Sequence, residues 1–192
     1  MKGWTNWRKE NYKFFARELA GEDKKKKLLD LGAGPCQFAK VFKQFSYTGV
    51  DSDPYPDVVV ADLTKELPFG AGTFDIVTAS NVLEHMPNPE NLLKEIQKVL
   101  SPRGIVVGTV PFIALPHQEP RDYFRYTHHG LRHLLSAAGF SNIEVTPIGF
   151  PLMPKFSFLP KILRRRVQNL YMRFSPSITL SHCEGYGFKA TK

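Results

Sequence analysis

Apolar residues along this chain follow two alternating patterns. Short runs rich in Val, Ile and Leu are typical of buried β-strands, and they alternate with segments in which apolar residues recur every three or four positions, as on one face of a helix. We predict strands at residues 28–31, 47–50, 58–61, 74–79, 105–110, 142–147 and 186–191. We predict helices at 88–100 and 127–138, the second ended by Gly139. This alternation favours a doubly wound α/β sheet.

The length of the chain fits one domain with additions to it. With 192 residues and 42% hydrophobic content, the chain can bury one core and is short for two, so we predict a single domain over 1–192. Residues 1–24 hold several large apolar side chains and predict an N-terminal helical extension. Residues 101–104, Ser-Pro-Arg-Gly, predict a turn into the fifth strand. Residues 150–182 form an insertion between the sixth and seventh strands.

A glycine turn directly follows the first predicted strand. Leu28, Leu29 and Leu31 surround an acid, Asp30, and the next residues are Gly32-Ala33-Gly34. Glycine permits backbone angles and close approaches that a β-carbon forbids. Residues 37–43 have helical spacing, so we expect the turn to present backbone amides at a helix N-terminus. The pattern indicates a pocket for a nucleotide-type cofactor.

Three acids stand at the ends of three successive predicted strands: Asp30, Asp51 and Asp62. Carboxylates at the same edge of a parallel sheet can bind hydroxyl and amino groups of a cofactor, although single acids at strand ends often cap a turn instead. Dinucleotide sites carry a third glycine, and Gln37 occupies that position here. Gln37 therefore weakens the alternative of an NAD-dependent oxidoreductase.

The ordered set of motifs resembles the class I S-adenosylmethionine-dependent methyltransferases of the small type that carry a Leu-Glu-His motif. The matching segments are Leu29 to Gly34, Gly49 to Asp51, Ala61 to Leu63 with Leu67 to Phe69, Phe74 to Val77, Asn81 to His85, Leu93 to Gly104, and the later Tyr123 to Thr127 with Gly130 to Phe140. The resemblance implies a seven-stranded sheet whose last strand is antiparallel. It also implies a pocket at the carboxyl ends of the first strands.

The resemblance assigns cofactor roles to particular positions. Asp30 and the glycine turn are expected near the methionyl portion, Asp51 on the ribose hydroxyls, and Asp62 on the adenine amino group. The full predicted set for S-adenosylmethionine is Asp30, Gly32, Ala33, Gly34, Asp51, Ser52, Asp62, Leu63, Ser80 and Asn81. The expected activity is methyl transfer to a small or amphiphilic acceptor. A non-catalytic cofactor-binding module is a further alternative, but the glycines and strand-end acids are intact.

Methyl transfer from a sulfonium is an in-line displacement of an activated group, so alignment matters most and a base helps only some acceptors. His85 and Tyr123 are the predicted catalytic residues, and a structural role for His85 is an equal alternative. Trp7, His117 and Tyr126 are predicted to bind the substrate. The histidines at 117, 128, 129 and 133 lack the spacing of a metal site, and we expect none.

The net charge of +8 is concentrated near the end of the chain. Lys and Arg exceed Asp and Glu by one over residues 1–150 and by seven over 151–192. Residues 160–174 predict an amphipathic basic helix, which fits a core-facing helix, a lid over the acceptor, or a peripheral contact of 155–174 with an anionic membrane that supplies a lipid-like acceptor. The nearly neutral charge of residues 1–150 argues against nucleic acid as a partner.

Cysteine content and hydropathy suggest a location. Cys36 and Cys183 are far apart and fit a reducing compartment. No signal-peptide-like apolar stretch begins the sequence, and no run of about 18 apolar residues occurs. We therefore expect a cytoplasmic protein, with peripheral membrane contact if 155–174 binds lipid.

Overall fold

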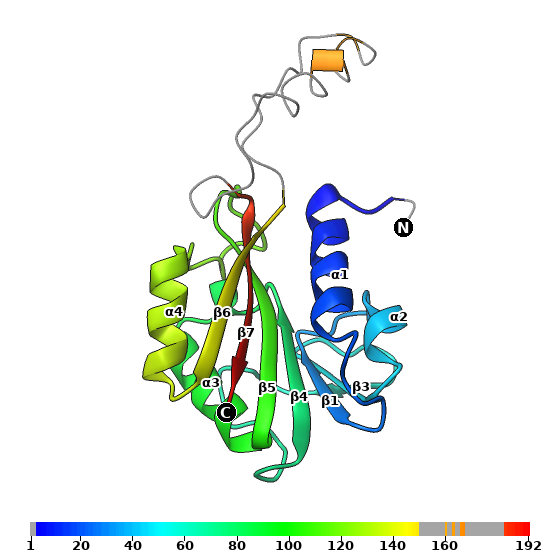
Figure 1. Cartoon of the computed structure of the whole chain (residues 1–192), viewed down its shortest axis with the longest axis vertical. Helices are drawn as coiled ribbons and strands as arrows, with labels where there is room; N and C mark the ends of the chain where they lie inside the picture. Colours follow the sequence, from blue (N-terminus) through cyan, green and yellow to red (C-terminus); the bar gives the residue numbers. More distant parts are fainter. Residues whose placement is uncertain (1–2, 150–159, 161–162, 164–165, 168–182) are drawn as a thin grey trace.

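The structure is a computed structural model that describes residues 3–149, 160, 163, 166–167 and 183–192. Within them, seven strands form one sheet in the order β3-β2-β1-β4-β5-β7-β6 (Figure 1). The strands are β1 Lys27–Leu31, β2 Ser46–Asp51, β3 Val58–Val60, β4 Phe74–Ser80, β5 Leu100–Pro111, β6 Ser141–Ile148 and β7 Gly185–Thr191. Strands β1 to β5 are parallel, whereas β7 is antiparallel to both β5 and β6. The predicted doubly wound sheet with an antiparallel last strand is confirmed.

The strand order reverses at β1, which pairs with β2 on one side and β4 on the other. Asp30 of β1 lies opposite Gly49 and Thr78 in the two ladders. In open α/β sheets, ligands bind in the crevice beyond the carboxyl ends of the strands at such a switch point. The glycine turn that follows β1 is therefore at the place where this topology puts a binding site.

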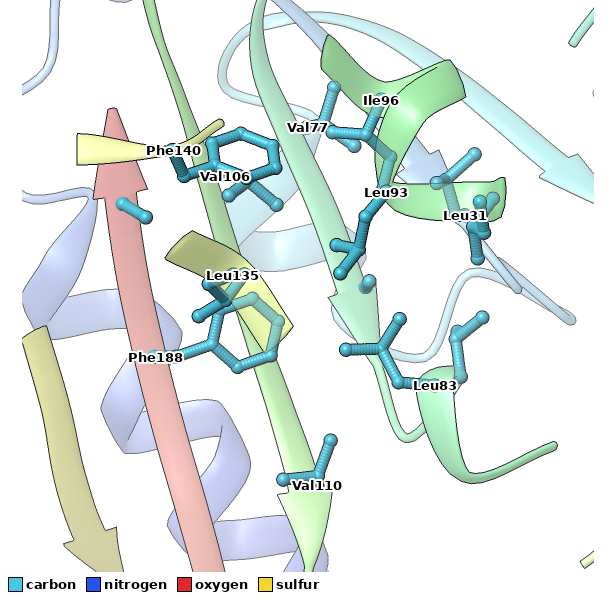
Figure 2. Packing of buried hydrophobic residues seen from close by; sticks show 14 of the residues in the cluster. Leu31, Val77, Leu83, Leu93, Ile96, Val106, Val110, Leu135, Phe140 and Phe188 are labelled. Carbon is cyan, nitrogen blue, oxygen red and sulfur yellow. The ribbon is translucent and has the colours of Figure 1, made fainter. Parts of the chain in front are cut away.

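Helices cover both faces of the sheet. They are α1 Asn6–Glu18, α2 Ala39–Phe42, the 3-10 helix η1 Leu83–His85, α3 Pro89–Val99 and α4 His128–Ala137. α1 and α2 lie on one side of the sheet and α3 and α4 on the other (Figure 1). Leu93 and Ile96 of α3 point toward Leu31 and Val77 of the sheet (Figure 2). The segment expected as an N-terminal helical extension contains α1, whose Phe14 and Phe15 are buried.

Two local predictions differ from the structure. The helix expected over 37–43 is present but shorter, over Ala39–Phe42, because the turn continues through Cys36, with a φ of 54°, to Phe38, whose φ of −103° and ψ of 23° are not helical. The turn expected at 101–104 is a bulge inside β5. Phe74 pairs with Leu100 and Ile76 pairs with Ile105, so the four residues between them lie opposite Asp75.

The predicted insertion over 150–182, with its basic amphipathic segment 155–174, lies outside the described residues apart from Pro160, Leu163, Arg166 and Val167. The described helices include none that is long and apolar enough to cross a bilayer.

Candidate functional site

The glycine turn after β1 leaves open space beside the backbone. Gly32 and Gly34 have φ values of 67° and 50°, in the left-handed region that favours glycine. A Cβ at Gly32 would lie 2.8 Å from Val82 Cγ2, so a side chain does not fit without movement. A Cβ at Gly34 would have no atom within 4 Å. Between them, the amide of the buried Ala33 donates to the Val50 carbonyl at 3.0 Å, which ties the turn to β2.

Asp51 joins the ends of β1 and β2. Its Oδ2 accepts a hydrogen bond from the Gly34 amide at 2.8 Å, and its Oδ1 accepts from the Asp53 amide at 3.1 Å. The Ser52 hydroxyl lies 3.5 Å from the same Oδ1. A carboxylate has about four lone-pair sites, so Asp51 retains acceptor capacity for hydroxyl groups of a ligand. It therefore fixes the glycine turn and can bind a ligand as well.

Asp30 is buried beneath this turn, with an exposed fraction of 4%. Its Oδ1 accepts from the Thr78 hydroxyl at 2.8 Å and its Oδ2 from the Tyr47 hydroxyl at 3.1 Å. Burial raises the pKa of Asp30 to about 7, although the two hydroxyls favour the ionised form; the nearby Asp51 charge raises it further. The two oxygens of Asp30 thus hold β1 to β2 and β4, and its role toward a ligand stays a prediction.

Asp62 is exposed beyond the end of β3. Its Oδ1 accepts from both the amide and the hydroxyl of Thr64, at 2.9 and 2.7 Å, and Lys65 Nζ lies 3.6 Å from Oδ2. The Thr64 hydrogen bonds lower the pKa of Asp62. These contacts match the turn-capping alternative, and the adenine role of Asp62 stays a prediction. The neighbouring Leu63 is buried in the core.

The residues after β4 contact the N-terminal helix. Asn81 has a φ of 54°, its amide donates to the Thr109 carbonyl at 2.9 Å, and its Oδ1 accepts from Trp7 Nε1 at 3.2 Å. The Ser80 hydroxyl lies 3.4 Å from that of Thr109. Trp7, a predicted substrate residue, therefore meets Asn81, a predicted cofactor residue, at the carboxyl edge of the sheet.

A second group of polar side chains lies at the same edge, in η1 and the loop after β5. Glu84 Oε1 is 3.9 Å from His85 Nε2 and also 3.9 Å from His117 Nε2. The Glu84 side chain is fully buried, and no other described residue donates a hydrogen bond to its two carboxylate oxygens. Burial raises the pKa of Glu84 to about 8. The structure thus brings the predicted residues His85 and His117 together around an acid that the sequence analysis did not select.

Neighbouring residues hold both histidines. His85 Nδ1 lies 2.6 Å from the Arg121 carbonyl. Asp122 Oδ2 lies 3.5 Å from His117 Nδ1 and accepts from the His117 amide at 2.9 Å. Arg125 forms a two-bond pair with Asp122, at 2.6 and 2.7 Å, which holds the pKa of that carboxyl well below its usual range. Burial lowers the pKa of His85, so its imidazole is neutral near pH 7.

The two predicted tyrosines have different surroundings. The Tyr123 side chain is 49% exposed, and its backbone amide donates to the Glu84 carbonyl at 2.8 Å. The Tyr126 side chain is buried, and its hydroxyl donates to the Leu83 carbonyl at 3.0 Å, so it anchors η1 to the loop before α4. Burial raises the pKa of Tyr126. Their roles toward a substrate stay predictions.

Glu84 is the residue that sequence reasoning missed. The feature that could have pointed to Glu84 is its position in the sequence. It is an acidic residue directly after the apolar Val82 and Leu83, which are buried, and acidic residues are rarely buried unless they are paired. The expectation of no metal site considered only the histidines from 117 onward. His117 instead meets Glu84 and His85 from 32 residues earlier in the chain, and the ligand atoms of these three lie within 4.8 Å of one another.

A family model described as a methyltransferase domain matches residues 4–145 of the chain. An uncharacterized methyltransferase of Mycobacterium tuberculosis (strain H37Ra) is 37% identical over 94 residues, which cover 42% of this chain and 37% of that protein. A similar protein of Mycolicibacterium vanbaalenii is 36% identical over the same length and coverage. The chain spans little more than a third of the length of these curated relatives.

Solved structures share the fold at low identity. A SAM-dependent methyltransferase from Archaeoglobus fulgidus has a TM-score of 0.67 at 18% identity, with 96% of this chain and 94% of that chain covered. The 1,6-didemethyltoxoflavin-N1-methyltransferase of Burkholderia thailandensis, solved with bound 1,6-didemethyltoxoflavin and S-adenosylhomocysteine, has a TM-score of 0.65 at 18% identity, with 98% of this chain and 78% of that chain covered. The [4+2]-cyclase SpnF has a TM-score of 0.65 at 21% identity, with 94% of this chain and 79% of that chain covered. At this identity the likeness establishes the fold alone.

Proposed function

The chain belongs to the methyltransferase domain family, and we propose that it transfers the methyl group of S-adenosylmethionine to a small or amphiphilic acceptor. The observation that carries this proposal is the glycine turn at Gly32 and Gly34, which has open space beside Gly34 and is tied to Asp51 at the next strand end. The open space beside Gly34 and the spare acceptor capacity of Asp51 suit the ribose and methionyl portions of the cofactor. S-adenosylmethionine supplies an activated methyl group when bound.

The proposed cofactor contacts follow the sheet edge. Asp51 accepts hydrogen bonds from both ribose hydroxyls, and Asp62 with the Leu63 amide contacts the adenine. Asp30 favours the ammonium group from its buried position near the turn. Asn81, held by Trp7 and Thr109, borders the sulfonium region. Each of these assignments rests on position at the carboxyl edge and on hydrogen-bonding capacity.

The acceptor is proposed to lie on the side of η1. Here His85 has its Nδ1 at hydrogen-bond distance from a backbone carbonyl, so the proton is on Nδ1 and Nε2 carries the lone pair that can accept a proton. His117 and the exposed Tyr123 border the same region. Since methyl transfer depends mainly on alignment, these residues are proposed to position the acceptor first and to assist proton removal second.

The test is cofactor binding by the purified chain, measured by isothermal titration with S-adenosylhomocysteine and, separately, with NAD. We expect binding of the homocysteine analogue and none of NAD. Turnover is then sought with labelled donor and a metabolite extract. NAD binding without S-adenosylhomocysteine binding would overturn the proposal, and analogue binding without any turnover would favour the non-catalytic alternative.

We also propose a peripheral contact between residues 155–174 and anionic membrane, on the basis of the sequence alone. Vesicles of phosphatidylserine and phosphatidylcholine test it by co-sedimentation. Charge reversal at residues 164–166 should abolish binding, because each basic side chain near such a surface contributes about 1 kcal/mol. The same reversal at residues 24–26, before β1, is the control. Wild-type chain that stays in the supernatant would remove the membrane proposal.

A further inference from the structure

Three potential metal-binding side chains from two segments of the chain converge at the carboxyl edge of the sheet. Glu84 and His85 come from η1, and His117 comes from the loop after β5. Both Glu84 oxygens and His85 Nε2 are buried without a hydrogen-bond partner. Buried polar atoms in folded proteins are nearly always paired, and a buried carboxylate that is not paired with a cation is costly. A cation in contact with Glu84, His85 and His117 would satisfy these buried atoms.

We propose that Glu84, His85 and His117 bind a divalent transition metal ion such as Zn²⁺. Two imidazoles and one carboxylate are a donor set that Zn²⁺ takes in catalytic sites. Both Glu84 Oε1 to Nε2 distances are 3.9 Å. Ligand atoms on a tetrahedral ion with bonds of about 2.1 Å lie about 3.4 Å apart. The two Glu84 distances are about 0.5 Å longer than this, and all three ligand atoms lie within 4.8 Å of one another, so side-chain rotations that shorten the separations by up to about 1.4 Å complete the site.

The protonation state of His85 suits metal binding. A carbonyl oxygen can only accept a hydrogen bond, so the 2.6 Å contact with the Arg121 carbonyl places the proton of His85 on Nδ1. The lone pair is then on Nε2, the atom that faces Glu84. Backbone carbonyls on the second nitrogen are typical partners of metal-binding histidines, because they fix both the tautomer and the ring orientation.

His117 has a matching arrangement with a carboxylate. Its Nδ1 lies 3.5 Å from both Asp122 Oδ2 and Arg125 Nη2. Arg125 can only donate a hydrogen bond, so its contact with His117 Nδ1 requires the tautomer with the proton on Nε2. A metal on Nε2 selects the other tautomer, in which Nδ1 gives up the contact with Arg125 and donates to Asp122 instead. The carboxylate-histidine-metal sequence that results is a recurrent one at zinc sites. Arg125 holds Asp122 in place through two further hydrogen bonds, which makes Asp122 a positioning residue.

The exposure of the three ligands differs in a way that leaves one side of the site accessible. The Glu84 side chain is fully buried and that of His85 is 12% exposed, whereas that of His117 is 37% exposed. An ion held by three protein ligands keeps a fourth position for water or for a substrate oxygen. In combination with the proposed function, an acceptor oxygen would bind there, and the metal would replace His85 as the group that promotes loss of its proton.

Binding of Co²⁺ to the full chain tests the site without cofactor or acceptor. Chelator-treated protein is titrated with Co²⁺, whose tetrahedral complexes absorb visible light, and Zn²⁺ is then added in competition. We expect one Co²⁺ per chain, displaced by one Zn²⁺. His117→Ala should weaken binding by more than about 100-fold, since loss of an outer-shell partner alone costs about 10- to 100-fold. Asp122→Asn should fall within that smaller range.

Controls separate the site from unspecific binding and from misfolding. His133→Ala removes an exposed histidine of α4 and should leave the titration unchanged. Circular dichroism and thermal melting confirm that His117→Ala is folded, and its partial exposure makes this variant safer than one at Glu84. Equal Co²⁺ affinity in wild type and His117→Ala, or no stoichiometric Co²⁺ in wild type, overturns the metal site. Neither result bears on S-adenosylhomocysteine binding, which is measured separately.

Discussion

The two ends of the candidate site differ in how their polar groups are satisfied. At the proposed cofactor end, Asp30, Asp51 and Asp62 each accept hydrogen bonds from neighbouring residues, so that none of these carboxylates lacks a partner within the fold. At the acceptor end, the Glu84 carboxylate and His85 Nε2 are buried without hydrogen-bond partners. The first end is stabilised by its own contacts, whereas the second contains buried polar atoms that a bound cation would satisfy under our proposal, so we expect the acceptor end to respond more to metal ions.

The cofactor end should nevertheless show a large pH effect through Asp30. Because the pKa of Asp30 is raised to about 7 in the fold, from a usual value near 3.8, the native state holds its proton more tightly than the unfolded chain. Its contribution to stability is complete below pH 4 and is lost as pH rises to about 7, by up to about 1.4 kcal/mol per pH unit.

Urea unfolding of cofactor-free protein from pH 4 to pH 8 measures the effect, with Asp30→Asn as the variant. The variant cannot ionise and should become the more stable of the two above pH 7, since the Thr78 and Tyr47 hydroxyls can also accept a hydrogen bond from the amide. Parallel curves for the two proteins would show that Asp30 is ionised throughout, and the two ends would then differ less than we infer.

Asp51→Ala should give the next largest effect, on ligand affinity. The substitution removes the hydrogen bond that holds the Gly34 amide and would remove the two charge-assisted hydrogen bonds that we propose to the ribose. We expect S-adenosylhomocysteine affinity to fall by about 100-fold, given about 1.5 kcal/mol for each bond to a charged group. Titration calorimetry measures it, with Asp53→Asn on the same loop as the control. An affinity unchanged within threefold would remove Asp51 from the ribose site.

The same comparison explains which parts of the site the sequence could predict. Asp51 and the glycine turn each follow a strand, and a parallel sheet places successive strand ends at one edge, so local order was enough to bring them together. The contact between Glu84 and His117 depends on how the loop after β5 packs on η1, and the two residues are 33 positions apart, so no local pattern in the sequence predicts it. The helix predicted over 37–43 forms two residues later than expected, because hydrophobic spacing does not record the backbone angles of the preceding turn, such as the positive φ of Cys36.

At the acceptor end, Tyr126→Phe should reduce the free energy of unfolding by about 1–2 kcal/mol. The substitution leaves the buried Leu83 carbonyl without its 3.0 Å hydrogen bond, and an unsatisfied buried acceptor costs about that much. Leu83 is the first residue of η1, which also contains Glu84 and His85, so Co²⁺ affinity should fall as well. Chemical denaturation and the Co²⁺ titration measure the two effects, with Tyr123→Phe, an exposed ring, as the control. Loss of stability without loss of Co²⁺ affinity would separate the packing of η1 from the metal site.

The smallest expected effect is at the boundary between the two ends, where Trp7 donates to Asn81 at 3.2 Å. Trp7→Phe keeps an aromatic ring on α1 and removes the indole N–H, at a cost of about 1 kcal/mol for one partly buried hydrogen bond. Asn81 directly follows β4, and Val82 separates it from η1. Loss of the hydrogen bond from Trp7 to Asn81 should therefore weaken S-adenosylhomocysteine binding a few-fold and leave Co²⁺ binding intact. Trp4→Phe, on the same N-terminal segment, is the matched control. A change in Co²⁺ affinity with none in cofactor affinity would reverse the assignment and place Trp7 with the acceptor end.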